Sequence, residues 1–172
     1  MFLAVDIETT GLDYNKCGII SVGMAGDLLK EHLFCNPFPC AVEYEALQVN
    51  KIPISYLRHN KTNLVEADFH LCDLFNKNKI KHESIVPIGF SVGSFDMVFI
   101  KKYLPNFSKF FSRKVFDLNT MYMFKFKDNW EDQKNNDKIE LLKNRNLTTE
   151  ALHNALNDAT LAWDIFQKYY QD

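Results

Sequence analysis

The sequence predicts an α/β domain in which a mixed sheet of five strands is flanked by helices. One observation is the pair Gly26-Asp27 between two apolar runs, a strong signal for an antiparallel hairpin. A second is that the later apolar runs alternate with helical patterns, which is typical of helices packed against a sheet. A third is that the 172 residues contain no repeat and no linker, so we expect a single domain over residues 1–172.

Hydrophobic periodicity gives the limits of the expected elements. Short apolar runs predict strands at residues 2–8, 19–25, 28–34, 84–90 and 115–117. Helical patterns predict helices at residues 42–50, 63–75, 94–103 and 157–170, a helix from residue 118 onward and a helical turn at 148–150. Asn63 is a candidate N-cap. Residues 128–145 are polar and poorly periodic, and we interpret them as a mobile loop or a weak helix.

The composition is that of a globular protein, with 47% hydrophobic residues, 24% charged residues and a net charge of −2. No apolar stretch is long enough to span a bilayer, and the N-terminus lacks the pattern of a signal peptide. We therefore expect a cytoplasmic protein that does not contact membranes. The four cysteines show neither a CxxC pair nor a zinc-type spacing, which favours reduced thiols: Cys17, Cys35, Cys40 and Cys72.

Residues 101–127 combine seven basic residues with a single acid, Asp117, and with interleaved aromatic residues. Such a mixture can hold a phosphate backbone and stack bases. It can equally consist of core aromatics separated by solvated lysines, and taken alone we favour this structural interpretation. The path of a nucleic-acid substrate along this segment remains a hypothesis.

Two carboxylates, Asp6 and Glu8, stand one residue apart at the end of the first predicted strand, so they project from the same face. Asp96 lies in the first turn of the helix that follows strand 84–90. Asp158 lies at the start of the last helix, five residues after His153. Because sites in α/β sheets form beyond the carboxyl ends of the strands, we expect the four acids and the imidazole to converge.

Four carboxylates held together repel one another unless cations lie between them. Two divalent cations would balance their charge, and hard oxygen ligands favour Mg²⁺ or Mn²⁺ over zinc. Two such ions form the clamp used for displacement at phosphorus, and a histidine can take the proton of the attacking water at neutral pH. Each acid alone is better explained as a solvated strand end or a helix N-terminal residue. Their joint occurrence favours the metal site.

The residues around these acids form three motifs, which are DIETTGL at residues 6–12, FD at 95–96 and HNALNDA at 153–159. In this order they resemble the DEDD 3′–5′ exonucleases of the histidine subtype (DEDDh). That family includes proofreading exonuclease subunits, ribonuclease T and oligoribonucleases. Connecting residues such as Glu45-Ala46 and 115–118 also resemble the family, so the similarity covers nearly the whole chain.

The resemblance implies a ribonuclease H-like fold and a role for each motif residue. The implied ligands of two Mg²⁺ or Mn²⁺ ions are Asp6, Glu8, Asp96 and Asp158, and the implied general base is His153. The residues implied to contact the terminal nucleotide or pack against the terminal bases are Thr9, Thr10, Gly11, Leu12 and Phe95. The family often carries His-Asn where this sequence has Ser91-Val92, so a side-chain amide that could brace the second motif is missing there.

We therefore expect a metal-dependent exonuclease that releases nucleoside 5′-monophosphates from the 3′ end of single-stranded DNA or RNA. The alternative is a nucleic-acid-binding scaffold of the same fold that no longer cleaves. Such a scaffold should have lost one of the four acids or the histidine, and all five are present. A calcium-binding protein is disfavoured because no loop carries alternating acidic ligands. The choice between DNA and RNA, the oligomeric state and a protein partner such as a polymerase stay open.

Overall fold

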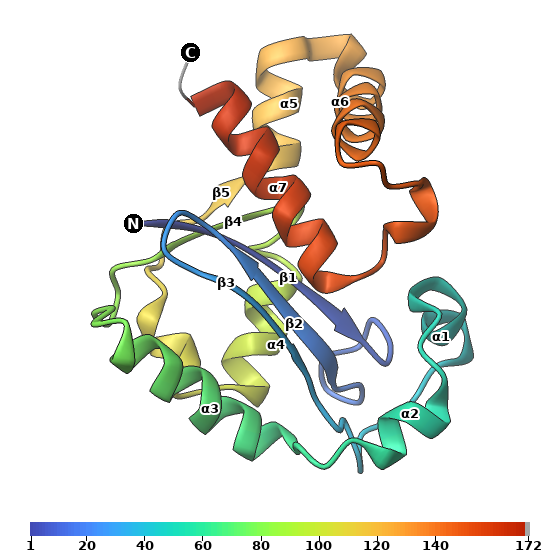
Figure 1. The fold of residues 1–172 in the computed structure, drawn as a ribbon, viewed down its shortest axis with the longest axis vertical. Helices are drawn as coiled ribbons and strands as arrows, with labels where there is room; N and C mark the ends of the chain where they lie inside the picture. The colour runs from blue at the N-terminus through green and yellow to red at the C-terminus, as the bar shows by residue number, and fades with distance from the viewer. Residues whose placement is uncertain (171–172) are drawn as a thin grey trace.

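The computed structural model describes residues 1–170 and contains a five-stranded mixed sheet flanked by helices (Figure 1). The strands are β1 (Phe2–Thr9), β2 (Ile19–Ala25), β3 (Lys30–Phe34), β4 (Val86–Gly89) and β5 (Phe116–Asp117). Their order is β3-β2-β1-β4-β5, with antiparallel pairs on the β3 side of β1 and parallel pairs on the β5 side. The predicted fold class, including its antiparallel start, is confirmed.

Seven α-helices are described: α1 (Tyr44–Asn50), α2 (Ile54–His59), α3 (Leu64–Lys77), α4 (Asp96–Tyr103), α5 (Leu118–Phe126), α6 (Trp130–Asn144) and α7 (Ala155–Tyr170). Of these, α2 was not expected. Asn63 caps α3 as predicted, because its side chain accepts hydrogen bonds from the backbone N–H groups of Val65 and Glu66. None of the described helices is both long and apolar enough to cross a bilayer. The four cysteines are all unpaired.

Successive side chains of β1 lie on opposite faces of the sheet, so they contribute to two different hydrophobic cores and place the acids on one face. Leu3, Val5 and Ile7 belong to the core built with α3 and α4, whereas Ala4 belongs to the core built with α5 and α7. Successive side chains on a strand point to opposite faces, so Asp6 and Glu8 fall on the same face as Ala4. Figure 1 shows α7 lying across this face of the sheet, with α5 and α6 beside it.

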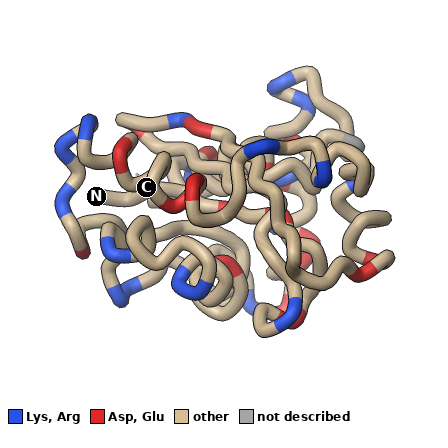
Figure 2. Tube along the Cα trace, turned by 90° about the horizontal axis from the view of Figure 1, so that it is seen from below, with Lys and Arg blue, Asp and Glu red and all other residues tan. Residues whose placement is uncertain are grey.

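The aromatic residues of segment 101–127 are buried or partly buried except Phe124, which is 89% exposed, whereas the basic residues are exposed. Phe107, Phe110 and Tyr122 are fully buried in the cores, whereas all seven basic residues of the segment are exposed. Figure 2 shows Lys and Arg distributed along the chain trace among Asp and Glu. These aromatics therefore serve packing, as the favoured interpretation expected, and the segment as a substrate path remains untested.

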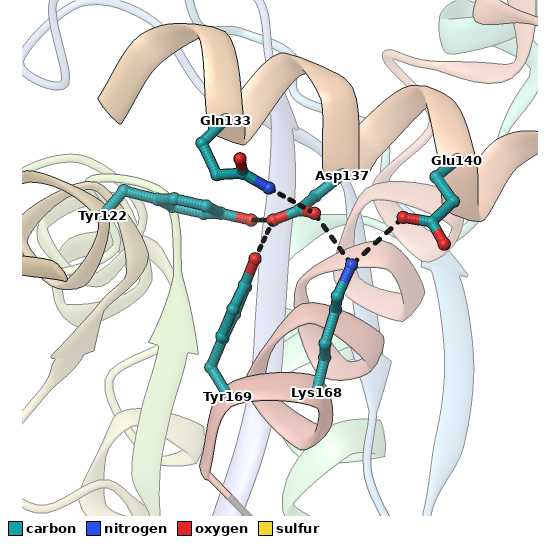
Figure 3. Close-up of polar contacts among 6 residues, drawn as sticks. All are labelled: Tyr122, Gln133, Asp137, Glu140, Lys168 and Tyr169. Atoms are coloured by element: carbon teal, nitrogen blue, oxygen red, sulfur yellow. Dashed lines mark hydrogen bonds and ion pairs between the residues drawn. The ribbon is translucent and has the colours of Figure 1, made fainter. Parts of the chain in front are cut away.

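The segment interpreted as a mobile loop or a weak helix, residues 128–145, instead contains the regular helix α6 (Trp130–Asn144). Its buried residues are an acid, Asp137, and Leu142, and the polar contacts of Asp137 hold the helix in place (Figure 3). Asp137 is 1% exposed, and its Oδ2 accepts hydrogen bonds from the hydroxyls of Tyr122 on α5, at 2.6 Å, and Tyr169 on α7, at 2.5 Å. A hydrophobic periodicity cannot reveal a helix whose most buried side chain is an acid.

Two further donors complete the Asp137 network. Its Oδ1 accepts hydrogen bonds from Lys168 Nζ at 2.9 Å and from Gln133 Nε2 at 3.1 Å. Lys168 also pairs with Glu140 at 3.1 Å. Burial alone would raise the pKa of Asp137, but the hydrogen bonds from the tyrosines and Lys168 outweigh it and lower the pKa. The network therefore joins α5, α6 and α7 through one ionised carboxylate.

Asp137→Ala should lower the free energy of unfolding by about 3 kcal/mol, because it leaves two tyrosine hydroxyls and an ammonium group without their shared acceptor. Urea denaturation of the variant against wild type measures this difference. Asp132→Ala, at an exposed position of the same helix, is the matched control and should change stability by less than about 0.5 kcal/mol. Equal stability of the two variants would contradict the role given to the network.

Candidate active site

Three carboxylates meet on the α7 face of the sheet. Asp6, Glu8 and Asp158 each offer one ligand atom, and these atoms all lie within 4.8 Å of one another. Asp6 and Glu8 come from the carboxyl-terminal half of β1, and Asp158 comes from the first turn of α7. The structure thus brings together three of the four acids that the sequence singled out.

A glycine on β2 allows this meeting. Gly23 is the cross-strand partner of Asp6, and a Cβ atom at Gly23 would lie 2.1 Å from the backbone carbonyl of Ala155, the first residue of α7. No side chain fits into that space, so the start of α7 lies directly on β2. This close approach brings Asp158 to the two acids of β1.

The fourth acid, Asp96, lies beside the group and is engaged by the backbone. β4 pairs with β1 only as far as Ala4 and Ile88, so the N–H group of Ile7 has no partner in β4. That N–H group donates to Oδ1 of Asp96 at 3.0 Å. Asp96 is only 4% exposed, and its negative charge acts on both Asp6 and Glu8. Its part in holding a metal stays a prediction.

The loop before Asp96 obtains a side-chain amide from elsewhere in the fold. Ser91 has a left-handed backbone conformation, with φ of 59°, and its Oγ accepts a hydrogen bond from Asn119 Nδ2 at 3.1 Å. Val92 is fully buried in the core. The amide that the sequence lacks at these two positions is therefore supplied by α5.

His153 lies immediately before α7 at the edge of the acid group. Its backbone is left-handed, with φ of 62°, and its N–H group donates to Oδ2 of Asp158 at 2.8 Å. The residue is exposed. This hydrogen bond fixes the position of the histidine relative to one of the acids.

Asp6, Glu8, Asp158 and His153 border a cavity of about 340 Å³, whereas Asp96 is not part of its lining. Its lining includes, besides these residues, Thr9, Leu12, Phe95 and, from α1, Ala46, Val49 and Asn50. Leu12 is 78% exposed and places an apolar side chain on the lining of this acidic cavity. The cavity has the size of a small-molecule site and combines an acidic floor with apolar walls.

Two of the residues expected to contact a nucleotide are not in this lining and shape the loop instead. Thr10 is fully buried; its hydroxyl donates to the carbonyl of Ala41 and accepts from the N–H group of Gly18. At Gly11, a Cβ atom would lie 2.4 Å from the carboxylate of Glu43. Backbone contacts from these two residues to a substrate stay a prediction.

The electrostatics of the acid group call for a positive partner. Burial, followed by the charges of Asp158 and Asp96, raises the pKa of Glu8 from 4.5 to about 8. Burial also raises the pKa of Asp6, Asp96 and Asp158 above its usual value. At neutral pH the group therefore holds protons or needs cations, and all-oxygen donors of this kind fit Mg²⁺ or Mn²⁺.

Sequence reasoning missed several residues around the site. Lys138 of α6 lies near enough to Asp6 and Asp158 to lower the pKa of both. It escaped notice because its segment gave no helical pattern. Asn50 lines the cavity and joins α1 to the end of β1, because its Nδ2 donates a hydrogen bond to the carbonyl of Thr9 at 3.2 Å. The Glu45-Ala46 resemblance to the family's connecting segment was the signal that α1 borders the site.

Known structures share this architecture. The zinc-bound *E. coli* exonuclease I complex with single-stranded DNA superposes with a TM-score of 0.69 at 14% identity, covering 99% of this chain and 41% of that one. Exonuclease I of Methylocaldum szegediense gives the same values. The chain has the ribonuclease H-like fold of exonuclease I. The E. coli enzyme bound to a dT13 oligonucleotide superposes with a TM-score of 0.69 at 15% identity, covering 97% of this chain and 40% of that one.

These comparisons establish the fold. No protein-family model matches the sequence, and no curated protein matches it. The chain spans about two fifths of the length of the exonuclease I chains, at 41% for the first two.

Stability of the metal-free protein should fall as pH rises from about 5 to about 8. Folded Glu8 keeps its proton up to about pH 8, whereas unfolded Glu8 loses it near 4.5, so the stabilising effect of that proton is full below 4.5 and is lost through this window. Thermal unfolding in EDTA measures the decrease. Mn²⁺ should reverse it at pH 8.

Glu8→Gln should reduce this pH dependence without abolishing it, because the amide does not ionise whereas the raised pKa values of Asp6, Asp96 and Asp158 act in the same direction. Glu131→Gln, at an exposed acid, is the control and should keep the wild-type dependence. A melting temperature of the chelated wild-type protein that stays constant or rises between pH 5 and 8 would contradict the electrostatic description of the acid group.

Proposed function

We propose that this chain is a metal-dependent 3′–5′ exonuclease of the DEDDh type that releases nucleoside 5′-monophosphates from single strands. The observation that carries the proposal is the convergence of Asp6, Glu8 and Asp158 with His153 on one cavity. Known structures with this fold support it, since they include exonuclease I bound to single-stranded DNA and in a zinc-bound form.

In this proposal Asp6, Glu8 and Asp158 hold divalent cations, with Asp96 as the fourth acid. Oxygen ligands alone favour Mg²⁺ or Mn²⁺ as the natural ions. When bound, two such ions activate a water and neutralise charge on the leaving oxygen of a phosphodiester. The raised pKa values of the acids are consistent with this role, because a site built for cations is strained without them.

The other residues position the strand and move the proton. Leu12 and Phe95 offer an apolar edge and a ring on which terminal bases can pack without sequence preference. His153 takes the proton of the attacking water; its backbone N–H bonds to Asp158, and the residue lines the cavity. A scaffold without cleavage would need neither the intact acid set nor this histidine.

Asp6→Asn should abolish hydrolysis in the presence of Mn²⁺ while the fold persists, because it removes one of the carboxylates that would hold the cations. His153→Ala should lower the rate by about 10²- to 10⁴-fold and leave strand affinity unchanged, because it removes only the general base. The assay follows end-labelled single and double strands of DNA and RNA on a gel, and identifies the released nucleotides.

Asp132→Asn is the control and should keep wild-type activity, because this exposed acid lies outside the site. Full activity of Asp6→Asn would exclude the site. Loss of strand binding in His153→Ala would show that the histidine does not act as the base.

A further inference from the structure

Lys138 brings a positive charge to the acid group from α6. Its Nζ lies 3.9 Å from the centre of the Phe90 ring, which directly follows β4. The ammonium is close enough to Asp6 and Asp158 to interact electrostatically with both. The residue is partly buried, so water screens these interactions only in part.

The neighbouring residue, Asp137, holds this part of α6 in place. Asp137 is the shared acceptor of the network that joins α5, α6 and α7 (Figure 3), so the backbone of α6 at this point is held against α7. Asp158 stands on the same helix α7. The backbone position of Lys138 is therefore fixed, and only its flexible stem is free to adjust.

Among the described residues the ammonium contacts the Phe90 ring but forms no ion pair. The ion pairs that they form use Lys16, Arg145 and Lys168, and do not include Lys138. Without metal, Lys138 offsets part of the charge of the acid group. Two divalent cations would balance Asp6, Glu8, Asp96 and Asp158 without Lys138. Glu43 and Glu45 also line the cavity, and neither forms an ion pair with Lys138. A phosphodiester carries a single negative charge that the ammonium of Lys138 can bind.

We propose that Lys138 binds a phosphate oxygen of the substrate strand next to the metal site and so positions the strand for cleavage. This inference rests on the proposed nuclease function. An ammonium group on a flexible stem is a usual phosphate ligand, and the ring of Phe90 stabilises the cation from its other side. The competing role is that of a counter-charge for the acids alone, without contact to substrate.

The two roles differ in the salt dependence of strand binding. Each phosphate contact of a single strand contributes about −0.7 to the slope of log affinity against log salt concentration. We would measure the affinity of labelled oligo-dT for the His153→Ala protein with Mn²⁺ at several salt concentrations, and repeat it with Lys138→Met added. Methionine keeps an apolar stem and removes the charge.

Lys138→Met should weaken binding on the order of tenfold at low salt and reduce the slope by about 0.7. Lys138→Arg should retain the wild-type slope because it keeps the charge. The matched control is Lys134→Met, one turn earlier on α6, where Nζ lies 4.5 Å from the Trp130 ring centre and bonds Asn119. This control should leave the strand affinity and the salt slope unchanged.

An unchanged slope in Lys138→Met overturns the inference, and tighter Mn²⁺ binding by that variant would assign Lys138 to the counter-charge role. An equal loss in Lys138→Met and Lys138→Arg also overturns it, because charge would then not be the cause. Failure of the parent protein to bind the strand overturns it as well. Hydrolysis by the wild-type protein tests the nuclease function separately. If strand binding depends on Lys138 but no hydrolysis occurs, the proposed nuclease function is wrong and the phosphate-binding role of Lys138 stands.

Discussion

Asp6, Glu8 and Asp158 hold their ligand oxygens within 4.8 Å of one another in a partly buried site, and this like-charge contact constrains what surrounds it. The cost of ionising such a group appears as the upward shift in the pKa of each acid. Protons, a lysine or metal ions can offset that cost. The placement of Lys138 and the all-oxygen donor set both follow from this requirement.

The fold meets the constraint with two kinds of packing. Apolar alternation in β1 sends Asp6 and Glu8 to the α7 face, and the bare backbone of Gly23 lets α7 approach closely enough to add Asp158. Polar packing does the rest, since Asp137 anchors α6 through the tyrosines of its neighbouring helices. The alternation of β1, the absence of a side chain at Gly23 and the buried Asp137 together position the residues of one site.

Much of this was predictable because it depends on local patterns. The β1 alternation and the Asn63 cap act over a few residues, and both are found in the structure. The hairpin at Gly26-Asp27 is found as well, although residues 26–29 connect its strands in place of Gly26-Asp27 alone. The helix α6 was not predictable in the same way, because the partners of Asp137 lie on α5 and α7 and are distant in sequence. The same distance hid Lys138, and it hid the bond that Asn119 makes to Ser91.

Manganese titration followed by electron paramagnetic resonance tests the central claim most directly, because free and bound Mn²⁺ give different signals. The wild-type protein, with a nucleoside monophosphate present, should take up two Mn²⁺ ions per chain. Asp158→Asn should lose most of this uptake, whereas the exposed-site variant Asp128→Asn should keep it. Absence of Mn²⁺ uptake by the wild-type protein, with or without the nucleotide, would contradict the account.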